Sequence, residues 1–385
     1  MRRITNVRLP QPLSHGEDNY WWLLLDEKDV VLSVNAMESG SALAGENWGG
    51  DWLSPMGIDL QINGGLGLAF PELTFDQLPL LLDLLDRLWL DGVEAICPTF
   101  ISCPTSSLRL GLDVLREARN QDSSNRCKLL GAHLEGPFLA KDRKGAHAEK
   151  YLCPPSLFVL DELIGGFENE IGLVTMAPEL LGSLEVIEKL KNLDIVISLG
   201  HSSADDGTCR LAFANGVMML THAFNAMPGL HHRAPGPLGE AIKNGKIFIG
   251  LIADGLHVEP NVVVLLQRLA SNQLVLVSDA LSPYGQSDGQ YEWDGRLILS
   301  HKGSCKLENG TLAGSTVPLL EACKNLARWT GNPSSAIWSA TISPRLVLFK
   351  GPKNNYDFLL GKPLRNLLRW GMNSQDNCLC WHRAA

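Results

Sequence analysis

Histidine and acidic side chains are concentrated in the middle of the chain, where they follow apolar runs. Seven of the ten histidines lie between positions 133 and 257, in motifs such as G-H-S-S (200–203) and T-H-A-F-N-A-M (221–227). Glu135 in G-A-H-L-E-G-P (131–137) and Asp279 in S-D-A (278–280) are acids in the same kind of position. Imidazoles and carboxylates are the usual protein ligands of a catalytic divalent metal. The pattern therefore predicts a metal-dependent hydrolase, provided that the fold brings these distant positions together.

Alternating strand and helix patterns predict such a fold. Short apolar runs ending in Gly, His, Asp or Glu predict strands at 58–62, 94–99, 128–134, 171–176, 195–199, 217–220, 247–252 and 274–277. Amphipathic helix patterns separate several of them, at 75–90, 107–118, 184–193, 205–215 and 261–270, and a further helix is expected at 319–330. This alternation predicts a parallel sheet, and eight repeats predict a (β/α)8 barrel of the TIM type. A barrel gathers the carboxyl ends of its strands on one face, and the residues expected there are Glu135, His201, His222, His257 and Asp279.

The two ends of the chain differ from this pattern. Apolar, β-rich runs at 20–25 and 30–34 predict a hairpin. We expect residues 1–54 to form the N-terminal part of a small β-domain and residues 55–344 to form the hydrolase barrel. Residues 345–385 are expected to form an irregular tail that can return to the small β-domain. The expected fold class is α/β, a TIM-like barrel with a small β-sandwich domain built from both ends of the chain.

Composition and charge exclude several classes of protein. With 45% hydrophobic and 19% charged residues over 385 positions, the chain resembles an ordinary globular protein. Its net charge is −9 and no basic stripe occurs, so we expect no nucleic-acid partner. No apolar run approaches the roughly 20 residues that span a bilayer, and the N-terminus lacks the apolar core of a signal peptide. We expect a cytoplasmic protein without a membrane partner, whose nine cysteines are reduced.

Glu135, His201 and His222 are the strongest candidates for metal ligands. Two imidazoles and one carboxylate leave a coordination position open for water, as catalytic sites do. The alternative is that each side chain is simply a hydrogen-bonded strand end. Asp279 is the candidate general acid/base, because a carboxylate beside an activated water can take its proton and pass it to a leaving group. Its alternative role is to cap a following helix.

Two loops carry the remaining candidates. His257 can hydrogen-bond a substrate carbonyl or hydroxyl, whereas Asp254 in the same motif can simply stabilise the loop. The glycine- and proline-rich segment 225–239 carries His232 and Arg233. The fork of an arginine matches phosphate geometry in a bidentate way, and a solvated basic turn is the alternative.

The motifs, taken in order, also resemble those of a known family. They are H-L-E-G-P-F, K-G-A-H, T-M-A-P-E, G-H-S, T-H-A-F-N-A-M, L-H-H-R, A-D-G-L-H-V, S-D-A and L-A-G-S. As an ordered set they are similar to those of the N-acetylglucosamine-6-phosphate deacetylases of the amidohydrolase superfamily. The resemblance implies that Glu135, His201 and His222 bind the metal and that Asp279 is the catalytic acid/base. It also implies that nine residues contact the sugar phosphate: Ala146, His147, Asn225, Ala226, Arg233, His257, Leu312, Ala313 and Gly314.

The resemblance has two further consequences. It implies a homodimer, because the family's arginine at the position of Arg233 reaches the phosphate of the neighbouring subunit. Many amidohydrolases carry His-x-His at the end of the first strand, where this chain has Gln61-Ile62-Asn63. Since amides supply no imidazole, we expect one divalent ion per subunit, with Zn as the leading choice and Fe, Co or Mn as alternatives. Residues expected in supporting roles are Gln61, Asn63, His133, His232 and Asp254.

The sequence thus predicts hydrolysis of the acetamide of N-acetyl-D-glucosamine 6-phosphate to D-glucosamine 6-phosphate and acetate. The nearest alternative is an amidohydrolase acting on another amide, such as a cyclic ureide, although such an enzyme usually needs two metals and His-x-His. A second alternative is a binding protein that has kept the barrel and lost catalysis. The complete set of ligands and acid/base argues against it, although the fold alone would not exclude it.

Overall fold

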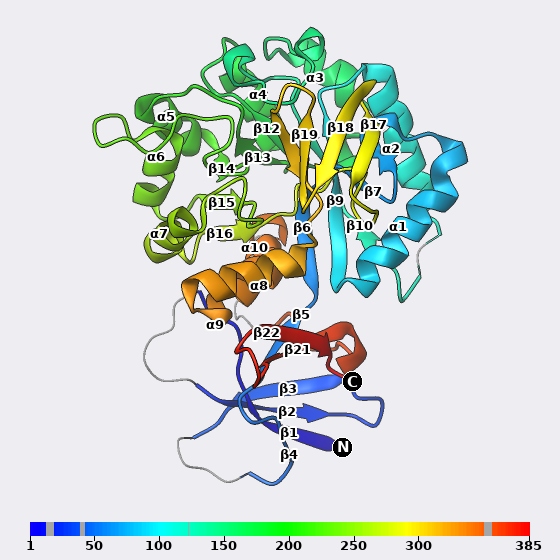
Figure 1. The fold of residues 1–385 in the computed structure, drawn as a ribbon, viewed down its shortest axis with the longest axis vertical. Coiled ribbons are helices and arrows are strands. Elements are labelled where there is room, and N and C mark those ends of the chain that lie inside the picture. The colour runs from blue at the N-terminus through cyan, green and yellow to red at the C-terminus, as the bar shows by residue number, and fades with distance from the viewer. Residues whose placement is uncertain (13–18, 39–42, 122, 350–355) are drawn as a thin grey trace.

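Eight parallel strands form the centre of the molecule. The structure is a computed structural model that describes residues 1–12, 19–38, 43–121, 123–349 and 356–385. The barrel strands pair in chain order, and an isolated parallel bridge between Ile62 and Ala280 joins the last to the first. They are β6 (Gly57–Ile62), β9 (Val93–Ile101), β11 (Ala132–Glu135), β12 (Ile171–Met176), β13 (Val196–Leu199), β14 (Val217–Leu220), β15 (Phe248–Leu251) and β16 (Leu274–Leu276). The predicted TIM-like barrel is confirmed (Figure 1).

One predicted strand is interrupted. The segment expected to form a single strand at 128–134 forms β10 (Lys128–Leu129) and β11, both of which pair with β9 in parallel. Between them, Gly131 lies against Gly172 at the start of β12. A Cβ at Gly131 would be 2.4 Å from the Gly172 nitrogen. The chain passes from one segment to the next at a position where only glycine fits.

Helices cover the outside of the barrel (Figure 1). In α1 the buried residues recur at helical spacing, which explains why this segment is helical: Leu81, Leu84, Leu85 and Leu88. The six predicted helices are confirmed, whereas α3 and α6 were not predicted. α6 begins at Gly236, within the segment 225–239 that we expected to be a loop, with Pro237 in its first turn. The helices around the barrel are α1 (Leu78–Leu90), α2 (Thr105–Arg119), α3 (Leu157–Ile164), α4 (Ser183–Asn192), α5 (Asp206–Asn215), α6 (Gly236–Asn244), α7 (Pro260–Ala270) and α8 (Leu319–Thr330).

The two ends of the chain meet in a small β-domain. One antiparallel hairpin, β2 (Trp21–Leu25) and β3 (Val31–Ala36), was predicted, and β1 (Arg2–Val7) and β4 (Glu46–Asn47) complete its sheet. In a second sheet, β21 (Leu367–Met372) lies between β5 (Trp52–Pro55) and β22 (Leu379–Arg383) and pairs with both. Residues from both ends of the chain share one hydrophobic core, among them Ile4, Leu23, Leu53, Leu364 and Leu367. The predicted sandwich of N- and C-terminal segments is therefore confirmed.

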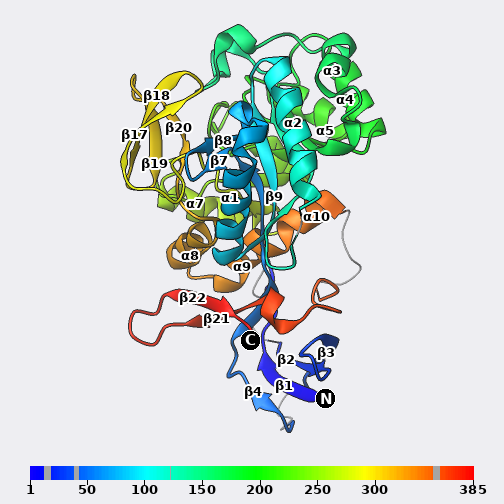
Figure 2. The same ribbon diagram turned by 90° about the vertical axis from the view of Figure 1, so that its right-hand side faces the viewer.

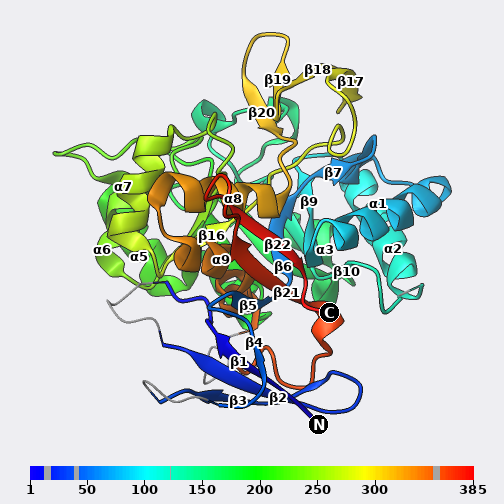
Figure 3. The same cartoon turned by 60° about the horizontal axis from the view of Figure 1, so that its bottom comes forward.

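The expectation of an irregular C-terminal segment was wrong. After α8 the chain forms α9 (Pro333–Thr341) and α10 (Ser343–Phe349) before it reaches β21. β22 then contacts α8, and Figure 3 shows β21 and β22 crossing beneath the barrel. Because β5 leads directly into β6, the small domain lies at the amino end of the barrel strands, away from the face that carries the predicted site.

A third sheet stands beside the barrel, as Figure 2 shows. It is antiparallel and follows β16: β17 (Gly289–Trp293), β18 (Arg296–His301), β19 (Ser304–Leu307) and β20 (Leu312–Ser315). A bridge between Ala280 and Ser315 joins it to the barrel next to Asp279. Its position brings residues of β17 and β20 to the carboxyl ends of the barrel strands.

Short elements connect these layers: β7 (Gly64–Gly65), β8 (Leu68–Ala69), and 3-10 turns at Phe70–Glu72, Phe75–Gln77, Lys141–Arg143, Glu149–Tyr151, Glu168–Glu170 and Leu364–Asn366. Within the described ranges, no helix combines the length and the apolar character needed to cross a bilayer.

Candidate metal centre and substrate cavity

The strongest candidates all lie where barrel strands end. Glu135 is the last residue of β11, while His201, His222 and Asp279 follow β13, β14 and β16. The last three adopt left-handed backbone conformations, with φ of 48°, 28° and 48°. Such φ values are uncommon outside glycine and cluster at functional sites. Each strand therefore ends in a turn that aims its side chain across the mouth of the barrel.

Glu135, His201 and His222 converge through three atoms. Glu135 Oε1 lies 3.1 Å from His201 Nε2 and 3.0 Å from His222 Nε2, and the two nitrogens are 3.1 Å apart. Ligands about 2.0–2.2 Å from one tetrahedral ion are separated by about 3.4 Å. The observed triangle is close to that spacing. The predicted three ligands thus meet at one point.

The hydrogen-bond partner of His201 indicates which tautomer of the ring faces the other two donor atoms. His201 Nδ1 lies 2.8 Å from the Arg143 carbonyl oxygen, which can only accept. In the neutral tautomer that this bond selects, the hydrogen is on Nδ1 and the lone pair of Nε2 faces the Glu135 carboxylate. In that tautomer, two electron-rich atoms lie 3.1 Å apart, an arrangement that suits a cation between them. The donor set fits a divalent metal, and the carbonyl fixes the tautomer as partners of metal-bound histidines do.

His147 also approaches Glu135, with Nε2 3.9 Å from Oε2, so Glu135, His147 and His201 form an alternative ligand group. His147 Nδ1 accepts a hydrogen bond from the Ser102 backbone N–H at 3.3 Å. A neutral His147 therefore carries its hydrogen on Nε2, which faces Glu135 as a donor. Burial lowers the pKa of His147 to about 3, so the ring stays neutral. His222 is the better third ligand, because its distances to the other two atoms are also shorter.

The carboxylate of Glu135 is charged although it is buried. Burial by itself would raise its pKa, but the adjacent His201 and His222 rings outweigh burial and hold the pKa well below the ordinary carboxyl range. An ionised carboxylate is the form that binds a metal.

Asp279 is held beside the triangle by the two amides that replace His-x-His. Asn63 Nδ2 donates to Asp279 Oδ1 at 2.7 Å, and Gln61 Nε2 lies 3.2 Å from both Asp279 Oδ1 and Glu135 Oε1. Burial and the neighbouring Glu135 charge raise the pKa of Asp279. A raised carboxyl pKa suits a group that must both accept and return a proton. Asp279 lies where it could exchange a proton with a ligand above the triangle, and within the described residues no helix begins directly after it for it to cap.

Asp254 orients His257 at the edge of the cavity. Asp254 Oδ2 accepts a hydrogen bond from His257 Nδ1 at 2.6 Å, and its Oδ1 accepts from the backbone N–H groups of Leu256 and His257. The carboxylate thus stabilises the loop and also fixes the ring. His257 Nε2 remains the ring nitrogen that can meet a ligand.

A cavity of about 310 Å³ opens over the triangle, a size suited to a small polar ligand. Most residues that the sequence assigned to the metal, the proton transfer or the substrate line it: Asn63, Glu135, Ala146, His147, His201, His222, Asn225, Ala226, His257, Asp279, Leu312 and Ala313. Other lining residues were missed: Ile101, Asp142, Arg143, Gly145, Ile252, Trp293 and Thr311. Arg143 and Asp142 bring charges of opposite sign to the wall, and the only signal of Arg143 in the sequence is its place within K-D-R-K-G-A-H (141–147).

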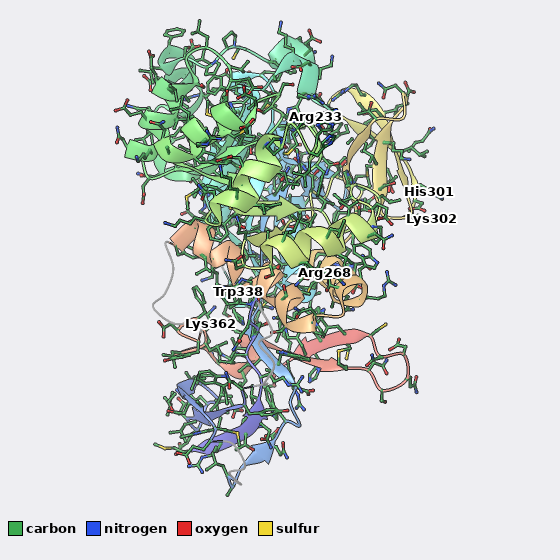
Figure 4. All side chains as sticks on the ribbon, turned by 90° about the vertical axis from the view of Figure 1, so that its left-hand side faces the viewer. Arg233, Arg268, His301, Lys302, Trp338 and Lys362 are labelled. Carbon is green, nitrogen blue, oxygen red and sulfur yellow. The ribbon has the colours of Figure 1, made fainter. Side chains whose placement is uncertain are left out.

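Three predicted contacts lie off this wall. His232 and Arg233 are exposed on the segment between β14 and α6, and neither lines the cavity. Figure 4 labels Arg233 on the barrel, at a distance from the small β-domain. Gly314 is buried behind Asp279, where a Cβ would meet the Asp279 carbonyl oxygen at 2.6 Å. Gly314 therefore supports the Asp279 backbone from behind.

His133 is buried inside the barrel below Glu135. Its Nε2 lies 2.7 Å from Thr175 Oγ1 and its Nδ1 lies 3.3 Å from Thr99 Oγ1. Burial lowers the pKa of His133 to about 4, so the ring is neutral. Its place is structural support beneath the site, with no face on the cavity.

Known proteins share this sequence and fold. The chain is 34% identical to an N-acetylgalactosamine-6-phosphate deacetylase of Escherichia coli O157:H7, over 77% of this chain and 78% of the relative. It is 35% identical to an N-acetylglucosamine-6-phosphate deacetylase of Caenorhabditis elegans, over 84% and 79%. No protein-family model matches the sequence.

Solved structures give the same picture. The N-acetyl-D-glucosamine-6-phosphate deacetylase of Mycobacterium smegmatis superposes with a TM-score of 0.80 at 25% identity, over 100% of this chain and 99% of that one. A D-hydantoinase reaches a TM-score of 0.52 at 13% identity, over 100% and 89%, which shows a shared fold alone.

Proposed function

The chain belongs to the N-acetylglucosamine-6-phosphate deacetylase family, and we propose that it hydrolyses the acetamide of N-acetyl-D-glucosamine 6-phosphate to D-glucosamine 6-phosphate and acetate. The observation that carries this proposal is the convergence of Glu135 Oε1 with the Nε2 atoms of His201 and His222, beside Asp279. The ordered motifs and the curated relatives supply the substrate class.

We propose one divalent ion per subunit, held by Glu135, His201 and His222, with Zn as the leading choice. When bound, such an ion supplies Lewis-acid polarisation of the amide carbonyl and activates water as a nucleophile. Gln61 and Asn63 use their amide nitrogens to hold Asp279 and Glu135, so these two side chains do not form a second metal site.

Asp279 moves the proton in this proposal. Its Oδ1 is held by Asn63 and Gln61, which leaves Oδ2 to face the water that attacks the acetamide carbon. Asp279 takes the proton of that water and then delivers it to the nitrogen of the departing amine. His257, oriented by Asp254, donates to the carbonyl oxygen as negative charge develops there.

The sugar and its phosphate contact the residues around the cavity. Ala146, His147, Asn225 and Ala226 bind the sugar phosphate from this chain's own wall. Because Arg233 is exposed and lies off this wall, we propose that it binds the phosphate in the cavity of a second copy, within a homodimer.

The C4 epimer of the substrate is a second candidate. The Escherichia coli relative is named for N-acetylgalactosamine 6-phosphate and matches this chain at 34% identity, as closely as the relatives named for the glucosamine compound. Both sugars present the same acetamide and the same phosphate, so the metal cluster and Asp279 would serve either. Which of the two sugars is preferred depends on the side chains that contact the sugar hydroxyl at C4.

Acetate release from four compounds tests the proposal. Pure protein loaded with Zn²⁺ is incubated with N-acetylglucosamine 6-phosphate, N-acetylgalactosamine 6-phosphate and the two unphosphorylated sugars. We expect the highest kcat/KM with N-acetylglucosamine 6-phosphate and much lower values without phosphate. Preference for the galactosamine compound would select the second candidate, and release from none of them would refute both.

A further inference from the structure

A run of buried side chains connects five neighbouring barrel strands directly beneath the metal triangle. Ser198 Oγ lies 2.6 Å from Thr221 Oγ1, which lies 2.7 Å from Thr175 Oγ1. Thr175 Oγ1 lies 2.7 Å from His133 Nε2, and His133 Nδ1 lies 3.3 Å from Thr99 Oγ1. All five side chains are at most 1% exposed. We call this run, from Ser198 to Thr99, the hydroxyl chain.

The hydroxyl chain has a fixed direction. Each hydroxyl has one hydrogen and a neutral imidazole has one N–H, so every donor must point the same way along it. The Thr99 hydroxyl can donate to the Cys97 carbonyl oxygen at 3.2 Å. Among the described residues, only the direction from Ser198 toward Thr99 and Cys97 gives every hydrogen an acceptor. The chain is therefore fully satisfied, and a satisfied polar network specifies one arrangement of its strands.

The members of the hydroxyl chain stand next to the metal ligands in sequence. His133 precedes Glu135 by two residues on β11 and so faces the same side of the strand. Thr221 immediately precedes His222, and Ser198 lies on β13 just before His201. The chain thus links the three strands that carry the three ligands.

Gly200 shows independently that two threonines of the hydroxyl chain pack closely against the backbone next to His201. A Cβ at Gly200 would lie 2.7 Å from Thr175 Cγ2 and 2.7 Å from Thr221 Cβ. Thr175 and Thr221 therefore press against the backbone of the residue immediately before His201. The position of that ligand depends on where these two threonines lie.

His222 depends on the hydroxyl chain more than His201 does. His201 is oriented through Nδ1 by the Arg143 carbonyl, whereas His222 Nδ1 has no hydrogen-bond partner in the described part of the chain. Asn225 donates to the His222 carbonyl oxygen but leaves the ring itself without a partner at Nδ1 among the described residues. The adjacent Thr221 fixes the start of this turn, because its hydroxyl is held by both Ser198 and Thr175. Building on the proposed function, we propose that the hydroxyl chain positions the metal ligands, and His222 above all, so that their donor atoms meet at one ion.

Thr175 offers the sharpest test, because it lies in the middle of the chain. Thr175→Val keeps the shape but breaks the chain on both sides, while Thr175→Ser keeps the hydroxyl. Thr341→Val is the matched control: Thr341 is also fully buried and its hydroxyl donates to the Ile337 carbonyl in α9, away from the site. The dissociation constant for Zn²⁺ is measured for each protein by competition with a chelator, together with the melting temperature of the metal-free form.

We expect Thr175→Val to bind Zn²⁺ about tenfold more weakly, at the lower end of the effect of partners that support metal ligands, and Thr175→Ser and Thr341→Val to stay within about twofold of wild type. If Thr175→Val bound Zn²⁺ like wild type, or if Thr341→Val weakened it equally, the positioning role would be overturned. Should Thr175→Val fail to fold, Ser198→Ala removes only the first donor. A smaller but measurable loss of affinity is then expected, and wild-type affinity would overturn the proposal.

These outcomes also separate this inference from the proposed function. Wild-type protein that binds Zn²⁺ and releases acetate, together with an unaffected Thr175→Val variant, refutes the positioning role alone. Wild-type protein that binds Zn²⁺ but releases no acetate, together with a weakened Thr175→Val variant, refutes the proposed function alone.

Discussion

The metal cluster and the segment that carries Arg233 differ in how completely one chain builds them. Glu135, His201 and His222 are 3–5% exposed, and their donor atoms lie 3.0–3.1 Å apart. Arg233 is exposed and does not line the cavity. Under the proposed function, the barrel of a single chain supplies the groups for hydrolysis, whereas phosphate recognition would require Arg233 from a second copy. The two regions should therefore fail in different ways when they are altered.

The largest effect is expected at Asp279. Asp279→Asn preserves the hydrogen bonds that the side chain accepts but cannot shuttle a proton, so kcat should fall by roughly 10²–10⁴-fold or more. Steady-state acetate release gives kcat, and elemental analysis gives the metal content, which should remain near wild type. A variant with normal metal and a tenth or more of wild-type kcat would show that another group moves the proton.

The next effect separates the two candidate ligand groups. His222→Asn should lose most of its bound metal and, with it, most of its activity. His147→Asn is the matched control, because its Nε2 carries a hydrogen and is 3.9 Å from Glu135; it should keep its metal and lose substrate affinity. Metal content after gel filtration decides between them, and the reverse result would assign the site to His147.

The residues of the metal cluster could be predicted from the sequence because the ends of strands can be recognised there. Apolar runs of strand length stop at Glu135 and just before His201, His222 and Asp279, and barrel topology then brings those ends together. The left-handed turns at the last three were not predictable, because residues other than glycine rarely adopt them and no local signal marks them. The hydroxyl chain was equally hidden, since serine and threonine in a strand give no sign of their partners.

A smaller effect, confined to binding, is expected at Arg233. Arg233→Ala should remove about 2–3 kcal/mol of phosphate binding, which is roughly a 30- to 150-fold rise in KM with kcat nearly unchanged. Unphosphorylated sugars should be handled as by wild type. Equal losses with both classes of sugar would argue against a phosphate contact.

Mixing the two variants sharpens the comparison between the regions. In a mixed homodimer of Arg233→Ala and Asp279→Asn, one cavity has a native Asp279 and receives a native Arg233 from the other subunit. We expect activity at low substrate concentration to exceed the sum of the separate variants. Strict additivity would place Arg233 and Asp279 in the same cavity of one chain.

Substitution of Asp59 is expected to change activity least, but to change how the free energy of unfolding depends on pH. Asp59 is buried at 1% exposure, and its Oδ1 accepts from the backbone N–H groups of Gln61 and Ser278. Burial raises its pKa to about 7. The unfolded chain therefore ionises this group first, so the native state loses stability as pH rises from about 4 to about 7 and then levels off.

Asp59→Asn removes this titration and keeps an acceptor for both N–H groups. Relative to wild type, the variant should gain up to about 4 kcal/mol of unfolding free energy between pH 4 and pH 8, the equivalent of about three pKa units. Urea unfolding at both pH values measures the difference. A constant difference between variant and wild type would show that Asp59 is ionised in the native protein throughout this range.

Residues outside the barrel were harder to predict. β21 pairs with β5, whose residues lie more than 300 positions earlier in the chain, and short strands give no sign of so distant a partner. Arg143 was missed for a related reason: it lies between Asp142 and Lys144, where a charged loop is the ordinary expectation, and only the folded chain places it on the cavity wall.

Titration of the metal-free protein with Zn²⁺ tests the central claim most directly. Acetate release from N-acetylglucosamine 6-phosphate is measured as Zn²⁺ is added in known equivalents per chain. Because one triangle of donors is formed by Glu135, His201 and His222, activity should rise from near zero and level off at one equivalent. Full activity without metal, a requirement for a second equivalent, or no acetate release at any Zn²⁺ concentration would contradict the account.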